Sequence, residues 1–150
     1  MRETNLTLIR KINKFYDDLL KISAHHFDLS LTDIKVCSFL MNHPRLNSAK
    51  HIVEYRMLPK SNVSTSIDKL VNDGYLTKIN DENDHRKYLL YLTDKAKPLC
   101  REIKEVNDYF YQILYGNIDH DLLEIQNRIN QQIILNIDNA RKEKEHGKER

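Results

Sequence analysis

Glycine, proline, cysteine and tryptophan are all scarce in this sequence. Its 150 residues include only 3 glycines, 3 prolines and 2 cysteines, and tryptophan is absent. So few helix breakers, beside many leucines, isoleucines, lysines and glutamates, predict a mainly α-helical chain. The sequence also lacks a glycine-rich phosphate loop, a nucleophile elbow and a paired-carboxylate motif. We therefore expect that the protein is not an enzyme.

Long apolar runs are missing as well. No stretch reaches the roughly 18 apolar residues that a membrane-spanning helix needs. The first residues, Met1-Arg2-Glu3-Thr4-Asn5, lack the apolar core of a signal peptide. We expect a cytoplasmic protein without a membrane partner.

Metal and redox chemistry have little support in the sequence. Cys37 and Cys100 are far apart, have no Cys-x-x-Cys partner and lack an evident neighbouring cation, so we interpret them as buried thiols. None of the seven histidines forms a His-x-x-x-His pair, and the adjacent His25 and His26 point about 100° apart on a helix. We predict no metal site and no cofactor.

Charge permits nucleic-acid binding without demonstrating it. The net charge is only +2, but residues 44–97 contain ten Lys/Arg and seven Asp/Glu, a local charge of +3. The remainder of the chain carries −1. This mild asymmetry is compatible with a DNA-binding segment in the middle of the chain.

The first half of the chain reads as three helices. Apolar residues at three- and four-residue spacing predict a helix from Asn5 to about His26. Ser30 or Thr32 is the candidate N-cap of a second helix, which should end near His43 because Pro44 follows. A short third helix is expected from about residue 47 or 48.

The segment from Leu58 to Thr93 is the most informative. Val63, Ile67, Leu70 and Val71 define the buried face of a fourth helix, whose opposite face is polar, and Gly74 is placed to end it in a left-handed cap. Residues 75–80 and 88–92 then read as two strands joined by a polar turn. A polar-faced helix followed by a hairpin is typical of a winged helix-turn-helix.

Two long helices complete the chain. Thr93-Asp94 precedes the fifth, where Pro98 predicts a kink or a later start. The sixth begins at Asp119 and carries an isoleucine-rich seam of Leu122, Ile125, Ile129, Ile133 and Ile137. One small lobe does not bury the stripes of the first, fifth and sixth helices, so we expect a symmetric homodimer. Its two recognition helices would suit a palindrome with half-sites about 34 Å apart.

At this point the sequence resembles the MarR family of winged helix-turn-helix transcriptional regulators. The resemblance rests on Leu31-Thr32 at the start of the second helix, Lys60-Ser61-Asn62-Val63-Ser64 with Ile67-Asp68-Lys69-Leu70 and Gly74, Asp84-His85-Arg86 in the wing, and Leu92-Thr93 after it. Two positions depart from the family pattern: Asn83 lies near the place of an additional arginine, and Lys78 stands where arginine is common. Both departures make the wing less basic.

The resemblance implies a single MarR-like domain over residues 1–150, mainly α with a small β-hairpin. Residues 30–95, approximately, would form the winged DNA-binding lobe. Residues 1–26 and 96–140 would form the N- and C-terminal dimerisation helices, and residues 141–150 a frayed charged tail.

The candidate DNA contacts lie on the fourth helix and the wing. Short hydroxyl and amide side chains contact phosphates or base edges, and an arginine in the wing suits the minor groove or its phosphates. The alternative for Arg86 is a structural salt bridge with Asp84, which we take as a structural residue of the wing. The predicted DNA-binding set is Lys60, Ser61, Asn62, Ser64, Thr65, Lys69, Lys78, His85, Arg86 and Lys87.

The resulting hypothesis is a sequence-specific double-stranded DNA-binding regulator, a repressor that binds a pseudo-palindromic operator as a homodimer. Relatives in the family bind small aromatic ligands between the dimer region and the DNA-binding lobe, which implies such an effector here. Tyr16, His26 and Tyr55 are the candidate ligand-binding residues. The alternative hypothesis is a dimeric winged-helix protein-interaction module that does not bind DNA.

Overall fold

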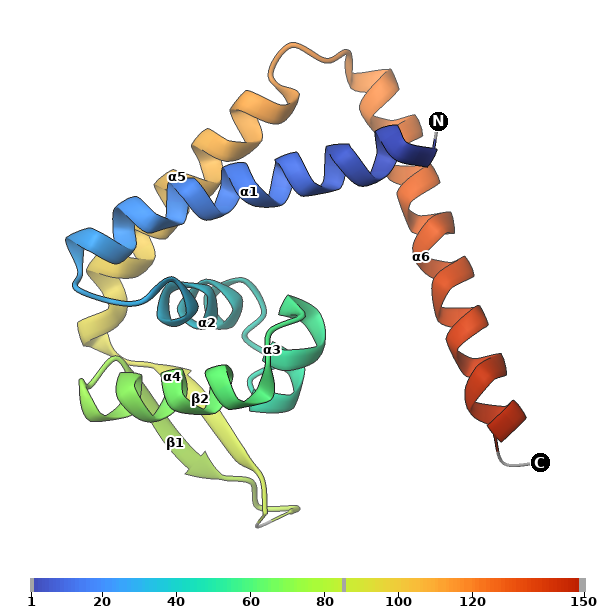
Figure 1. The fold of residues 1–150 in the computed structure, drawn as a ribbon. Helices are drawn as coiled ribbons and strands as arrows, with labels where there is room; N and C mark the ends of the chain where they lie inside the picture. The colour runs from blue at the N-terminus through green and yellow to red at the C-terminus, as the bar shows by residue number, and fades with distance from the viewer. Residues whose placement is uncertain (1, 85, 149–150) are drawn as a thin grey trace. The chain divides into compact units, whose positions relative to one another are not determined.

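The computed structural model describes residues 2–84 and 86–148, and the side chains of residues 4–84 and 86–144. The elements, in chain order, are α1 (Arg2–His26), α2 (Leu31–Asn42), α3 (Ala49–Arg56), α4 (Lys60–Asn72), β1 (Leu76–Asn80), β2 (Tyr88–Leu92), the 3-10 turn η1 (Asp94–Ala96), α5 (Lys97–Tyr115) and α6 (His120–Lys148) (Figure 1). This confirms the expected mainly helical fold with a small hairpin. The chain divides into two compact units, residues 1–110 and residues 111–150.

Local capping signals set the boundaries of the helix-turn-helix. The Ser30 hydroxyl accepts from the Asp33 N–H, and the Asp33 carboxylate accepts from the Ser30 N–H, so Ser30 and not Thr32 caps α2 in a reciprocal capping box. The Ser48 hydroxyl caps α3 by accepting from the His51 N–H at 3.3 Å. These two serines therefore fix where the first two helices of the motif begin.

The core of the first unit lies between α2 and the helices around it. α2 packs against α1, α3 and α4, and also contacts β2. Its apolar side chains are buried with those of α4, as the periodicity of α4 predicted for Val63, Ile67 and Leu70. The largest fully buried apolar side chains of the unit are Phe39, Leu20, Ile34, Ile52, Leu70, Leu76, Leu99 and Ile103.

The hairpin follows α4 through a left-handed turn. Gly74 has φ of +81°, the conformation that glycine adopts without strain. β1 and β2 pair antiparallel, from Leu76 opposite Leu92 to Asn80 opposite Tyr88. The Leu90 N–H donates to the Asn47 carbonyl at 2.8 Å, which fixes the hairpin against the connection before α3. In Figure 1 the hairpin extends away from α4 as an arm, the wing of the motif.

Pro98 has the effect predicted from the sequence. Thr93 leads into η1, and α5 begins only at Lys97, one residue before the proline. Proline in the first turn costs no hydrogen bond, because the first N–H groups of a helix have no partner in the helix. The fifth helix therefore starts late and not with a kink.

α1 and α6 both expose apolar side chains. The C-terminal half of α1 buries Leu20 and Ala24, but Leu6 and Ile9 near its beginning are 57% and 54% exposed. In the second unit, the whole seam of α6 is between 44% and 59% exposed: Leu122, Ile125, Ile129, Ile133 and Ile137. α6 also continues to Lys148, through residues predicted as part of a frayed tail. Lysine, arginine and glutamate are good helix formers, which accounts for the longer helix.

Within the described residues, no helix is both long enough and apolar enough to span a lipid bilayer.

Candidate nucleic-acid interface

The N-terminal half of α4 carries five of the predicted DNA contacts on its exposed surface. Lys60, Ser61, Asn62, Ser64 and Thr65 are all exposed. They are held there because Val63, Ile67 and Leu70 bury the opposite face of the same helix. The helix therefore presents short polar side chains, which fit close to a nucleic-acid groove.

A buried carboxylate fixes α4 against α2. Asp33 is only 1% exposed, and its carboxylate accepts a hydrogen bond from the Ser66 hydroxyl of α4 at 2.5 Å. The Lys69 ammonium lies 3.5 Å from the same carboxylate and 3.0 Å from that of Asp73. Partial burial lowers the pKa of Lys69, but hydrogen bonds and charge from Asp73 and Asp33 outweigh it and raise the pKa overall. Lys69 is thus a charged link between α2 and α4.

Arg86 and Lys87 of the wing differ in whether their side chains pair with a carboxylate. Asp84 accepts from the Arg86 backbone N–H at 3.1 Å and pairs with the Lys87 ammonium at 3.3 Å. Within the described part of the chain, the Arg86 guanidinium has no carboxylate partner. The contacts of the Asp84 carboxylate are thus with the backbone of Arg86 and the side chain of Lys87. His85, also predicted to bind DNA, lies outside the described residues.

A groove of about 640 Å³ joins the beginning of α3, the exposed face of α4 and the wing. Its charged side chains are Lys50, Asp68, Lys78, Asp81, Arg86 and Lys87, so cations outnumber anions. Its other lining residues are Ser48, Ala49, His51, Ser64, Ile67, Tyr88, Leu89 and Leu90. The groove brings together four of the predicted contacts, Ser64, Lys78, Arg86 and Lys87. It also contains Lys50 and His51, which the sequence pattern did not indicate.

Lys78 faces into this groove from β1 and is paired there. Its ammonium lies 2.5 Å from the Asp68 carboxylate of α4 and 5.8 Å from the centroid of the Tyr88 ring. Asp68 thus lies on the same helix as the predicted contacts but points toward the protein's own wing.

The three predicted ligand-binding residues lie in separate side-chain clusters of the first unit. The half-buried Tyr16 donates to Asn107 at 2.7 Å and lies 3.2 Å from the Ser38 hydroxyl. His26 is exposed and lies 2.6 Å from Glu102. Tyr55 is 60% exposed, with its ring 5.8 Å from Phe39. Of the three, only Tyr16 is joined to a buried polar network.

The two cysteines lie in the first unit as free thiols. Cys37 is fully buried, and burial, with smaller contributions from Cys100 and Asp33, raises its pKa. Burial also raises the pKa of Cys100. A raised pKa leaves little thiolate at neutral pH, so neither thiol has the electrostatics of a reactive cysteine. Among the described residues, no group of three or more His, Cys, Asp or Glu is placed so that it could hold a metal ion.

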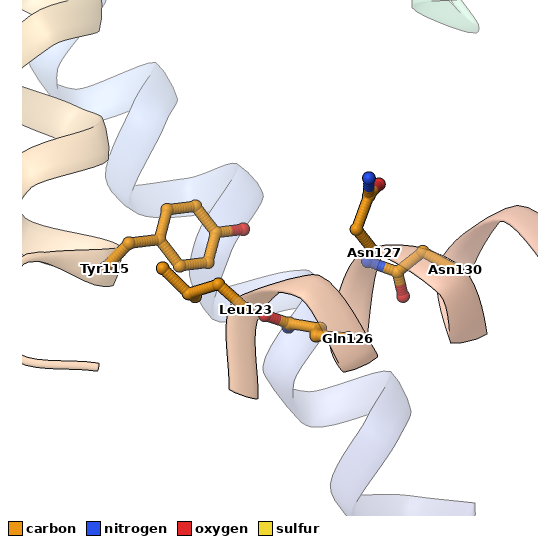
Figure 2. A pocket seen from close by; sticks show the side chains of 5 residues that line it. All are labelled: Tyr115, Leu123, Gln126, Asn127 and Asn130. Carbon is orange, nitrogen blue, oxygen red and sulfur yellow. The ribbon is translucent and has the colours of Figure 1, made fainter. Parts of the chain in front are cut away.

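The second unit contains a shallow hollow of about 280 Å³ between the end of α5 and α6. Figure 2 shows Tyr115 and Leu123 close together, with the amide side chains of Asn127 and Asn130 further along α6. Gln126 completes the lining. With no charged side chain, this hollow has no group to attract phosphate, and we do not include it in the candidate interface.

A helix-turn-helix that leads into a two-stranded hairpin defines the winged helix-turn-helix class. Residues 27–87 of this chain match the model of the MarR family. This part of the chain, which holds α2, α3, α4 and β1, is therefore similar to the MarR family. The expected family resemblance is thereby confirmed.

Individual relatives agree with this assignment. The chain is 31% identical over 78 residues to YfiV, an uncharacterised HTH-type transcriptional regulator of Bacillus subtilis strain 168; the match covers 52% of this chain and about half, 48%, of that protein. A MarR transcriptional regulator from Methanosarcina mazei Go1 has a similar structure, with a TM-score of 0.71 and 22% identity over 91% of this chain and 98% of that one. A MarR protein from Peptoclostridium difficile DA00132 gives a TM-score of 0.69 at 22% identity, over 93% and 87% of the two chains. At such identities the solved structures establish the shared fold.

Proposed function

We propose that this chain is a homodimeric transcriptional regulator that binds a pseudo-palindromic operator in double-stranded DNA. Relatives that carry the same winged-helix unit are transcription regulators. The observation that best supports DNA binding is the arrangement of α4, whose exposed polar half lies beside a groove richer in cations than anions. α4 occupies the major groove, with Ser61, Asn62, Ser64 and Thr65 reading base edges or phosphates.

The wing contacts the neighbouring DNA backbone and minor groove. Arg86 supplies the principal wing contact, because its guanidinium is not occupied by a described carboxylate. Lys60 at the beginning of α4 and Lys50 at the beginning of α3 add phosphate contacts on either side of the groove. In this arrangement Asp84 orients the wing backbone and does not touch DNA.

The regulator acts as a repressor that a small aromatic effector releases. The Tyr16 hydroxyl joins α1 and α5 through Asn107, and Ser38 extends this network to Arg56 at the end of α3. The Arg56 Nε is buried and has no hydrogen-bond partner among the described residues. An anionic or phenolic ligand that engages this network would favour one position of the DNA-binding lobe over another, by differential affinity.

The test is a binding titration against random and selected duplexes at two salt concentrations. A DNA-binding regulator shows affinity that falls steeply with salt, with a slope of about −0.9 for each phosphate contact. Selection from a random pool then yields a two-fold-related sequence with half-sites about one helical turn apart. No binding to any duplex at low salt would overturn the proposal and leave the protein-interaction module as the better account.

Arg86→Ala is expected to weaken binding to all duplexes and to flatten the salt slope. A dimer loses two phosphate contacts, so the slope of log affinity against log salt becomes shallower by about 1.8. Raising the salt from about 50 to about 200 mM should therefore weaken binding by the variant about twelvefold less than binding by the wild type. The measurement is fluorescence anisotropy with a labelled duplex. The matched control is Lys14→Ala, which removes an exposed cation from α1 and leaves the slope unchanged. An equal slope in wild type and Arg86→Ala would remove Arg86 from the contacts.

A further inference from the structure

One ion pair in the groove joins the recognition helix to the wing. Asp68 lies in α4 and Lys78 in β1, ten residues apart in sequence, and their charged atoms are 2.5 Å apart. The Asp68 side chain is 62% exposed and that of Lys78 is 32% exposed. A pair this accessible contributes little to stability. Its importance lies in where it places the two charges.

Lys78 is engaged on two sides. Its ammonium donates to Asp68 and lies over the Tyr88 ring at 5.8 Å. A phosphate that approached Lys78 would have to displace the Asp68 carboxylate, which also repels it. By contrast, Lys60 is exposed and has no carboxylate partner in the described part of the chain.

We infer that Asp68 is a positioning residue that holds the wing against α4 through Lys78 and keeps Lys78 out of phosphate contact. The inference rests on the proposed DNA-binding function. It reassigns Lys78 from a DNA contact, as the sequence suggested, to an internal link. It also explains how an aspartate can lie on the face proposed to bind DNA. The negative charge of Asp68 is compensated by the ammonium of Lys78.

Salt dependence tests this assignment directly. Asp68→Asn frees Lys78 to contact phosphate, so the slope for a dimer steepens by about 1.8. Asp68→Glu retains the pair and retains the wild-type slope. Lys78→Gln weakens binding, because Asp68 is left unpaired, but does not flatten the slope. In the double variant Asp68→Asn/Lys78→Gln, the slope returns to that of wild type.

Asp81→Asn is the matched control in the same groove. Asp81 accepts from the Asn83 N–H at 2.9 Å and pairs with no cation among the described residues. Its neutralisation frees no lysine, and the slope stays at the wild-type value. An unchanged slope in Asp68→Asn, or a flattened one in Lys78→Gln, would overturn the inference while leaving DNA binding intact.

A second measurement needs no DNA. With a limiting amine-acylating reagent and mass spectrometry, Lys78 is expected to react more slowly than Lys60 in wild type and in Asp68→Glu. In Asp68→Asn the Lys78 rate rises toward that of Lys60, because the ammonium has lost its partner. Equal Lys78 rates in wild type and Asp68→Asn would overturn the inference. This measurement does not depend on duplex binding. It therefore tests the Asp68–Lys78 pair even if the proposed DNA-binding function fails.

Discussion

Replacing Ile129 and Ile133 by aspartate is expected to convert the proposed homodimer into a monomer. Both side chains lie on the seam of α6 and are 54% and 48% exposed in the single chain. If the seam is buried between two copies, the double variant removes four apolar side chains from each dimer. At about 1.5 kcal/mol each this is about 6 kcal/mol, which raises the dimer dissociation constant about ten-thousandfold. Sedimentation velocity over a concentration series gives the result.

Gln131→Asp is the matched control. Residue 131 is exposed and lies on the opposite side of α6 from residues 129 and 133, because successive helix positions are about 100° apart. It introduces one aspartate, half the added charge of the double variant, without touching the seam, so the control stays dimeric. Dimerisation of Ile129→Asp/Ile133→Asp at wild-type concentrations would show that the seam is not the contact between chains.

Loss of the dimer should affect DNA binding in a particular way. A monomer keeps α4 and the wing but engages one half-site only, so it loses the advantage of the linked second contact. It should therefore bind a full palindrome and an isolated half-site with nearly equal affinity. The dimer, in contrast, should discriminate strongly between them.

The fold was predictable where its signals are local. The serines at positions 30 and 48, Gly74 and Pro98 each act within a few residues, and each marks a boundary that the sequence indicated. The charged residues 141–148, predicted as part of a frayed tail, are helical in the structure, which fits the high helix propensity of lysine, arginine and glutamate. Hydrophobic periodicity and turn residues predicted the order of the elements, and the family resemblance agreed with that order.

For the candidate site, the sequence could predict which face of α4 is exposed, but not the partners of its charged side chains. Periodicity placed Ser61, Asn62 and Thr65 on the exposed side of α4, but it carries no information on which cations have partners. Asp68 with Lys78 and Ser66 with Asp33 are pairs that form across elements, ten and 33 residues apart. Such pairs depend on tertiary packing, so the sequence treated Lys69 and Lys78 as free cations. The Ser30-x-x-Asp33 spacing was a usable sign of a capping box, but not of the bond to Ser66.

Asp33→Ala is expected to destabilise the first unit by about 3 kcal/mol and to loosen α4 against α2. The carboxylate satisfies the Ser30 N–H at the beginning of α2 and the Ser66 hydroxyl of α4. Loss of the cap costs about 1 kcal/mol, and leaving the buried hydroxyl without a partner costs about 1–3 kcal/mol. Urea denaturation followed by circular dichroism, at a fixed chain concentration because a dimer is expected, measures the change.

Two companion variants separate the parts of this effect. Ser66→Ala removes the donor but leaves the Asp33 carboxylate bonded to the Ser30 N–H and near Lys69, so it should cost only about 1 kcal/mol. In Asp33→Ala/Ser66→Ala the orphaned hydroxyl is gone, and the loss should be smaller than the sum of the single losses, as expected for residues in contact. Strict additivity would mean that the 2.5 Å contact carries no coupling. A free energy of unfolding for Asp33→Ala within about 0.5 kcal/mol of wild type would show that Asp33 does not hold α4 in place.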